Sequence, residues 1–244
     1  MNVHIGCSGY NYREWKGMFY PENIPQSKWL EYYTEHYNTV EINASFYRFP
    51  SGKSLKIWYD KTPTNFRFSL KANNQITHFK KFNGTQELIN EFYDVADKSL
   101  KDKLECILFQ LPPSVKYSRE TLDRIVEQLN PAFNNVLEFR DAGWWNEDVY
   151  KILKSNKIIF CISSYPGLPD DFVKTTDTVY VRLHGKTELY KSNYSNHELQ
   201  QLRDSIDRSK AKHAFIYFDN TWGGNAIANA QTMQQLMNVN QKQL

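Results

Sequence analysis

The segment Leu137–Trp145 contains charged side chains, capable of catalysis or ligand binding, at the end of an apolar run. It presents a carboxylate at Glu138 and a guanidinium at Arg140, and then breaks before two adjacent tryptophans. Side chains two positions apart on a strand share a face, so these two groups lie opposite Leu137 and Phe139. Because burying charge is costly unless partners compensate it, we expect this pair to line an enclosed functional site.

Other apolar runs of the chain carry polar side chains at equivalent positions. In six of the eight runs, the alternate positions opposite the apolar ones carry polar or charged groups near the C-terminal end of the run. These are Glu41 and Asn43; Arg67, Ser69 and Lys71; Gln110; Glu138 and Arg140; Arg182 and His184; and Asp219. If the apolar parity faces covering helices, all of these side chains point towards one common axis.

The elements that must position these residues are eight short strands alternating with longer helices. The predicted strands are Val3–Cys7, Thr39–Asn43, Phe66–Lys71, Glu105–Leu111, Asn135–Arg140, Ile158–Ser163, Thr178–His184 and His213–Asp219. The predicted helices are Ser27–Tyr37, Ser51–Asp60, Thr85–Lys103, Ser118–Asn130, Glu147–Ser155, Ser195–Ser209 and Gly224–Met237, with a short one near Leu168–Lys174. This alternation predicts an α/β protein in which residues 1–244 form one TIM-like (β/α)8 barrel domain. A doubly wound open sheet is the alternative, although such sheets seldom need eight units.

The composition and the net charge of the chain exclude some classes of function. Hydrophobic residues make up 41% of the chain and aromatic residues 15%, which is enough for a sizeable core. A net charge of +3 is too mild for a dedicated nucleic-acid binder. The opening residues Met1–Ile5 lead into a strand without a basic or long apolar segment, so we expect a cytoplasmic protein without a membrane partner. Cys7, Cys106 and Cys161 lie in or at the ends of apolar runs and are predicted to be buried, reduced thiols.

Several ordered motifs resemble the YecE-like family, a family catalogued as a domain of unknown function. They are Gly6-Cys7-Ser8-Gly9-Tyr10 with Trp15, Thr39–Tyr47, Phe66–Lys71, Phe109–Pro113, Glu138-Phe139-Arg140 with Trp144-Trp145, Val181–Gly185, and Tyr217–Asn220 with Gly223-Gly224 and Asn229-Ala230. The resemblance covers essentially the whole chain. It implies a TIM-barrel-like fold and leaves the activity undefined.

An anion site is the first chemical hypothesis for the mouth of this barrel. The loops after the last two predicted strands contain Lys186 and the run Trp222-Gly223-Gly224, which precedes the last helix. Barrels often bind phosphate there, because free backbone N–H groups at a helix N-terminus favour negative charge. The paired glycines could instead make only a tight turn. Seven further side chains at or near the strand ends would complete the ligand site: Asn43, Tyr47, Lys71, Gln110, Arg140, Trp144 and Arg182.

Acid–base catalysis is the second hypothesis, with Glu41, Glu138, His184 and Asp219 as the catalytic groups. Carboxylates among cations can have their pKa values displaced in either direction, which acid–base work requires. The alternative is an ion-pair network that neutralises the neighbouring cations without catalysis. The same four residues could also hold magnesium or manganese in a metal-dependent hydrolase, although three cations on the same inner parity argue against a metal.

Together these patterns predict an enzyme of the hydrolase or isomerase type acting on a small anionic, phosphorylated ligand at the mouth. No dinucleotide G-x-G-x-x-G or phosphate-loop motif occurs, and no cofactor is predicted. The rival hypothesis is a non-catalytic protein that binds a nucleotide or single-stranded nucleic acid, since stacking rings and positive charge suit both. The sequence makes no prediction of the oligomeric state.

Overall fold

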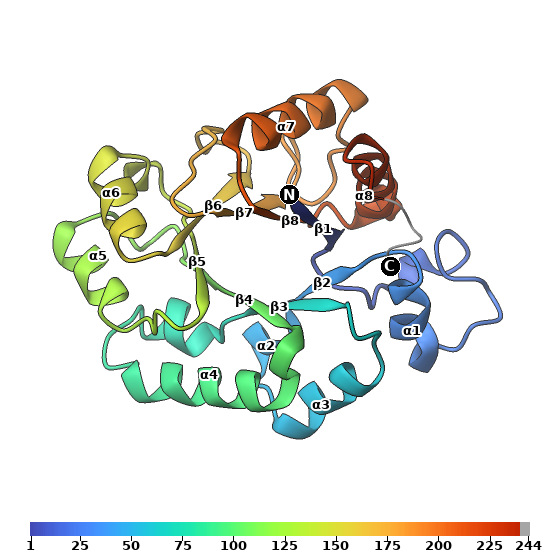
Figure 1. Ribbon diagram of the computed structural model, residues 1–244, viewed down its shortest axis with the longest axis horizontal. Helices are drawn as coiled ribbons and strands as arrows, with labels where there is room; N and C mark the ends of the chain where they lie inside the picture. Colours follow the sequence, from blue (N-terminus) through green and yellow to red (C-terminus); the bar gives the residue numbers. More distant parts are fainter. Residues whose placement is uncertain (240–244) are drawn as a thin grey trace.

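Eight parallel strands form a nearly closed barrel surrounded by helices in the computed structural model, which describes residues 1–239 (Figure 1). The strands are β1 (Asn2–Cys7), β2 (Thr39–Ile42), β3 (Arg67–Lys71), β4 (Leu104–Gln110), β5 (Asn134–Glu138), β6 (Ile159–Ser164), β7 (Thr178–Leu183) and β8 (His213–Phe218). They pair in the order β1-β8-β7-β6-β5-β4-β3-β2, so only β1 and β2 lack a continuous ladder. The predicted eight-stranded barrel is confirmed.

Side chains join β1 to β2 where the ladder is missing. The Tyr33 hydroxyl accepts a hydrogen bond from the Cys7 amide at 2.8 Å and donates one to the Thr39 carbonyl at 3.1 Å. The two strands approach so closely that a Cβ added at Gly6 would lie 2.1 Å from the Thr39 carbonyl oxygen. Glycine is therefore required at this position, because any other residue would push the strands apart.

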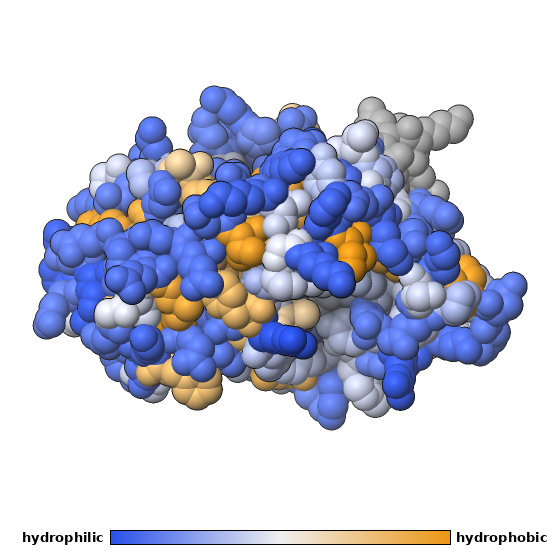
Figure 2. All heavy atoms as spheres, turned by 90° about the horizontal axis from the view of Figure 1, so that it is seen from below, coloured by the Kyte–Doolittle hydropathy of each residue, from blue (hydrophilic) through white to orange (hydrophobic). Residues whose placement is uncertain are grey.

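The helices form an outer layer around the strands (Figure 1). They are α1 (Trp29–Thr34), α2 (Ala44–Tyr47), α3 (Gly52–Asp60), α4 (Gln86–Leu100), α5 (Arg119–Val126), α6 (Glu147–Ser155), α7 (Asn196–Ser209) and α8 (Asn225–Leu236). Serine side chains cap α3, α5 and α7 at Ser51, Ser118 and Ser195, which explains why these helices begin where the sequence predicted. Figure 2 shows the side of the molecule where α3 and α4 lie; most of it is hydrophilic, as expected for the solvent face of such helices.

The short helix predicted near Leu168–Lys174 is wrong, because this segment is not helical. Pro169 lacks an amide hydrogen and disfavours helical geometry in the residue before it. The extended chain is anchored to β6 instead, since the Thr175 hydroxyl accepts from the Phe160 amide at 2.9 Å and donates to the Ile158 carbonyl at 2.7 Å. The sequence also gave no sign of α2 or of the π-helix Gln75–Phe79 that follows β3.

The barrel interior divides into an apolar lower part and a charged mouth. The lower part is a separate cluster of eight buried side chains: Cys106, Leu108, Val136, Ile159, Cys161, Tyr180, Phe215 and Tyr217. These belong to the inner parity of their strands, whereas Cys7 lies in the larger core between strands and helices. All three cysteines are buried and free, as the sequence predicted.

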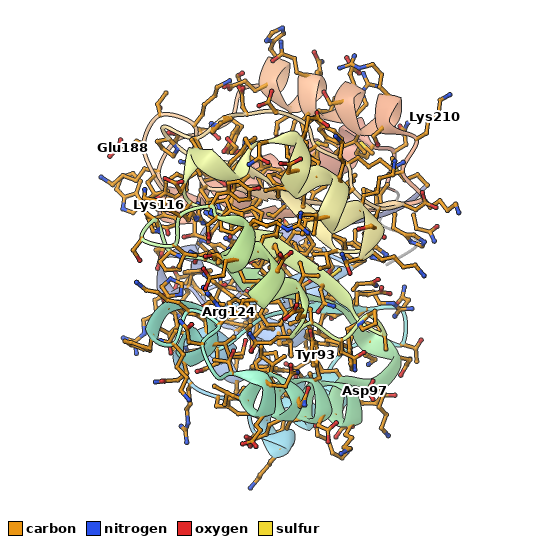
Figure 3. The ribbon with its side chains drawn as sticks, turned by 90° about the vertical axis from the view of Figure 1, so that its left-hand side faces the viewer. Tyr93, Asp97, Lys116, Arg124, Glu188 and Lys210 are labelled. Atoms are coloured by element: carbon orange, nitrogen blue, oxygen red, sulfur yellow. The ribbon has the colours of Figure 1, made fainter. Side chains whose placement is uncertain are left out.

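The C-terminal end of the strands is one face of the molecule. In Figure 3, Lys116 and Glu188, from the segments after β4 and β7, lie at one end of the barrel, and Asp97 and Lys210 lie at the other. The segments that follow all eight strands therefore surround the mouth, because the strands are parallel. Within residues 1–239, no helix is long and apolar enough to cross a membrane.

Candidate functional site

Arg182, the fifth residue of β7, lies at the centre of the charged mouth and is only 1% exposed. Its guanidinium holds three carboxylates. Nη2 is 2.7 Å from Glu41 Oε1, Nη1 is 2.7 Å from Glu138 Oε2, and Nη2 is 3.2 Å from Asp219 Oδ2. Such charge-assisted contacts are strong because the surroundings exclude water. One guanidinium thereby joins side chains from four different strands or strand ends.

Glu138 at the end of β5 is fully buried and has three further contacts besides the one with Arg182. Oε1 accepts a hydrogen bond from the Ser163 hydroxyl at 3.0 Å and lies 2.8 Å from Arg140 Nη2 and 2.8 Å from His184 Nε2. Burial by itself raises the pKa of this carboxyl, but the nearby Arg140, Arg182 and His184 more than offset burial and hold the pKa well below its usual range. Glu138 is therefore ionised at neutral pH.

His184 lies between two carboxylates directly after β7 and is fully buried. Besides its contact with Glu138, its Nδ1 is 2.8 Å from Asp219 Oδ2. Burial opposes ionisation of Asp219, but Arg182 and His184 prevail and lower the pKa of that carboxyl. The side chain of Asp219 retains 12% exposure, which Glu41 and Glu138 do not.

Arg140 lies just beyond β5 and forms the upper, more accessible part of the site. Its side chain is 6% exposed, and its guanidinium lies 4.1 Å from the centre of the Tyr165 ring. Nη2 contacts Glu138 and His184, whereas Nη1 is buried without a hydrogen-bond partner among residues 1–239. A buried guanidinium nitrogen without a partner is costly, and an anionic ligand would satisfy it.

Lys71 is the last residue of β3 and differs from both arginines in its surroundings. Its Nζ lies 4.3 Å from the centre of the Phe46 ring, and no ion pair within 4.0 Å joins it to a carboxylate of the described chain. Burial and the positive charge of Arg182 lower the pKa of this amine to about 8, against the opposing effect of the carboxylates. Lys71 therefore exchanges a proton near physiological pH.

His78 also belongs to the mouth, and the residues predicted from the sequence to form the site did not include it. It lies on the π-helix after β3, and its ring meets the Phe46 ring edge-on at 4.9 Å. Burial, Lys71 and Arg140 lower its pKa to about 4, so the imidazole is neutral at pH 7. The sequence feature that could have identified His78 as a site residue is its position in the segment after a predicted strand, where other mouth residues also lie.

Two of the predicted ligand-binding residues, Gln110 and Asn43, lie at or directly after the ends of their strands, and each donates a hydrogen bond to a backbone carbonyl there. Gln110 at the end of β4 is 8% exposed and donates to the Leu111 carbonyl at 2.8 Å. Asn43 follows β2, donates to the Ser8 carbonyl at 3.3 Å, and leaves its Oδ1 buried without a partner. Gln110 also pairs in the strand register with Glu138 of β5.

The predicted phosphate loops lie apart from Arg182 and Arg140. Lys186 is 55% exposed and lies 3.7 Å from Asp170, beside a cavity of about 520 Å³ between β6, β7 and α7. Gly223 and Gly224 have positive φ and border a different hollow of about 360 Å³, near Met18. The structure therefore does not bring the Lys186 amine and the glycine pair together with the buried cluster.

Trp144 does not face a ligand. Its ring is fully buried, stacks on Phe139 at 4.3 Å and donates from Nε1 to the Val115 carbonyl at 2.9 Å. This placement contradicts the predicted ligand-binding role, because the 3-10 helix Ala142–Trp144 that follows β5 carries the ring into the core. Two other predicted aromatic residues remain available, since Tyr47 is 77% exposed and Trp222 is 61% exposed.

The site thus has two layers, which differ in how available their side chains are to a ligand. In the lower layer the carboxylates of Glu41 and Glu138 are saturated by Arg182 and are closed to solvent, so they position the guanidinium. In the upper layer Arg140, Lys71 and Asp219 retain accessible surface or unused bonding capacity. A guanidinium occupies the point where the carboxylates meet, and residues 1–239 contain no group of three His, Cys, Asp or Glu side chains suited to hold a metal ion.

These features define a (β/α)8 barrel protein with a buried ionic cluster at its C-terminal mouth. The chain belongs to the family described as "Protein of unknown function DUF72", whose pattern matches residues 4–244. It is 24% identical over 271 residues to UPF0759 protein YunF of Bacillus subtilis, covering 97% of this chain and 95% of that protein. Over 90 residues it is 27% identical to UPF0759 protein YecE of Escherichia coli, covering 37% and 30%. The resemblance to the YecE-like family is confirmed.

Solved structures agree with the fold. A DUF72 family protein from Thermotoga maritima gives a TM-score of 0.89 at 28% identity, covering 98% of this chain and 100% of that one. One from Enterococcus faecalis gives 0.84 at 20% identity, covering 98% and 96%. A sugar phosphate isomerase/epimerase from Parabacteroides distasonis gives 0.55 at 10% identity over 98% and 97%. The last two likenesses concern the fold alone.

Proposed function

We propose that the protein binds a small anionic, phosphorylated ligand at the C-terminal mouth and acts on it by acid–base chemistry of the hydrolase or isomerase type. The observation that carries this proposal is Nη1 of Arg140, a buried guanidinium nitrogen without a partner at the accessible layer of the mouth. Guanidinium groups bind phosphate and carboxylate oxygens through paired, charge-assisted hydrogen bonds.

The surroundings of Arg140 favour a fixed anion site. Glu138 and the Tyr165 ring hold the guanidinium from two sides, so little side-chain entropy is lost when an anion binds. The amine of Lys71 lies in the same mouth and offers a second nitrogen without a carboxylate partner. An anion placed between these two groups would complete bonds that the protein itself leaves unmade.

Exposed aromatic rings suggest that the ligand also has a ring or another flat part. Four exposed aromatic side chains lie in the segments after β2, β3, β7 and β8: Tyr47, Phe79, Tyr190 and Trp222. Because these segments surround one end of the barrel, the rings stand around the mouth. Such rings bind flat or apolar ligand surfaces by stacking.

Proton transfer would fall to the groups of the upper layer. Asp219 is ionised at neutral pH and partly exposed, which suits a base. Lys71, with a pKa of about 8, suits an acid or a base near neutral pH. Glu41 and Glu138 would act indirectly, by holding Arg182 and Arg140 in place.

Isothermal titration with inorganic phosphate and glycerol 3-phosphate tests the proposal in the wild type and in Arg140→Ala. Losing charge-assisted bonds worth about 1.5–3 kcal/mol should weaken binding about 10- to 150-fold. Arg119→Ala is the matched control, because Arg119 also pairs with a carboxylate but lies exposed on α5; it should leave binding unchanged.

Equal affinity in the wild type and Arg140→Ala, or no binding of either compound, would contradict the proposal. Tight binding of a single-stranded oligonucleotide with a steep salt dependence would favour the nucleic-acid-binding alternative instead.

A further inference from the structure

We propose that Lys71 is a nucleophilic amine that forms a Schiff base with an aldehyde or ketone group of the ligand. This inference rests on the proposed function, since Arg140 would hold the anionic part of the same molecule. It assigns the ligand to the class of anionic carbonyl compounds.

The main chain of Lys71 is fixed on both sides. The residue pairs with Leu108 of β4, its carbonyl accepts from the Ser45 hydroxyl at 2.7 Å, and the next amide, that of Ala72, donates to the Leu108 carbonyl at 2.8 Å. A side chain that begins on a rigid strand is held more accurately than one on a loop. The amine is thus positioned at the mouth by bonds that do not involve the amine itself.

The amine has the surroundings of a nucleophile rather than those of a fixed positive charge. Arg140 and Arg182 each have a carboxylate within 2.8 Å, whereas the Nζ of Lys71 lies on the Phe46 ring and has no ion pair in the part of the chain that the structure describes. A lysine desolvated beside another cation is the usual setting for amine catalysis.

The charged groups that act on Lys71 come from β2, β5 and β7 and from the end of β8. Arg182 from β7 favours the neutral amine, and burial acts in the same direction. Glu138 from β5, Asp219 after β8 and Glu41 from β2 oppose this effect, but their charges are shared with the arginines. With a pKa of about 8, about a quarter of the amine is neutral at pH 7.5, compared with about 0.1% of an ordinary lysine.

The reaction balances without an oxidant or a reductant. The neutral amine attacks the carbonyl carbon, a C–N bond forms as the C=O π bond breaks, and the proton that nitrogen then loses passes to the oxygen to give a carbinolamine. A second proton, taken from solvent, reaches the hydroxyl group; the C–O bond breaks, water leaves, and the nitrogen lone pair forms the C=N bond of a protonated imine. Such an imine withdraws electrons from the adjacent carbon, so a base can remove a proton there, which is the first step of an isomerisation. Asp219 and the neutral His78 are the nearby groups that can carry these protons.

The test uses pyridoxal 5′-phosphate, an anionic aldehyde with a flat ring, followed by borohydride reduction and peptide mass spectrometry. With equimolar probe, the reduced adduct should lie mainly on Lys71, although every other lysine competes for the aldehyde. The yield should rise with pH with a midpoint near 8, and inorganic phosphate should reduce it. Lys71→Arg keeps the charge but removes the nucleophile, so it should lose this adduct; its thermal melting curve reports whether it is folded.

The outcomes separate this inference from the proposed function. If phosphate binds and depends on Arg140, but the adduct spreads over the exposed lysines with no preference for Lys71, the Schiff-base inference is wrong and the anion site stands. If phosphate neither binds nor protects, the anion site fails too. A preferential, phosphate-sensitive adduct on Lys71 supports both.

Discussion

Replacing Arg182 with methionine should destabilise the protein strongly, because the side chain fills the same space but no longer neutralises three carboxylates. The carboxylates differ in the contacts that remain to them when Arg182 is absent. Glu138 keeps Arg140 and His184, whereas Glu41 keeps only the Tyr180 hydroxyl, at 2.7 Å. Removing one partner of a buried ion pair typically costs about 3–5 kcal/mol. Since a folded domain is stable by only about 5–15 kcal/mol, this is a large share of the total.

Urea unfolding at pH 7, followed by circular dichroism, measures this loss. In a chain of this length, a loss of about 3–5 kcal/mol in the free energy of unfolding should lower Tm by about 6–20 °C. Lys212→Met is the control, because Lys212 forms a comparably short ion pair with Asp177, at 2.7 Å, but both side chains are exposed; it should unfold like the wild type. Adding Glu41→Gln to Arg182→Met should recover part of the loss, since it removes the carboxylate left with one partner.

The same variant should show a characteristic pH dependence. In the wild type the pKa values of Glu138 and Asp219 are lowered, so their ion pairs stabilise the fold above the ordinary carboxyl range and lose this effect only as pH falls through the lowered values. Without Arg182 both pKa values rise, and these groups become protonated at a higher pH. The stability difference between wild type and variant should be full at pH 7 and shrink below about pH 5. A variant as stable as the wild type at pH 7, or a difference that does not change with pH, would refute this reasoning.

Two further substitutions test the fold around the site. Trp144→Ala should cost about 3–5 kcal/mol in urea unfolding while leaving the Kd for phosphate unchanged, because the ring is core; a folded variant that no longer binds phosphate would restore its predicted ligand-binding role. Gly6→Ala should cost about 1–3 kcal/mol or more and lower Tm, because the added methyl meets the Thr39 carbonyl. Gly52→Ala at the start of α3 has its nearest contact at 3.3 Å and should melt close to the wild type.

The barrel, and the side of each strand that faces its axis, could be predicted from the amino-acid sequence. Strand positions could be predicted because hydrophobic period and turn signals are local. The alternation of β5 placed Glu138 and Arg140 on the inner face and Leu137 and Phe139 on the outer face, as the structure shows. Most helices could be predicted for the same reason, since caps such as Ser118 and Ser195 act within one turn.

Which of the inward side chains remain available to a ligand depends on contacts between strands and could not be predicted from the sequence. The sequence predicted the same catalytic role for Glu41, Glu138 and Asp219. In the structure Arg182 contacts all three carboxylates across the barrel, and of the three only Asp219 is partly exposed. Likewise, the direction of Trp144 depends on packing against a residue of its own strand end, and the closeness of His78 to Lys71 depends on a π-helix that has no local signal. Pairing between residues far apart in the chain sets burial and charge compensation, and one strand's sequence does not contain that information.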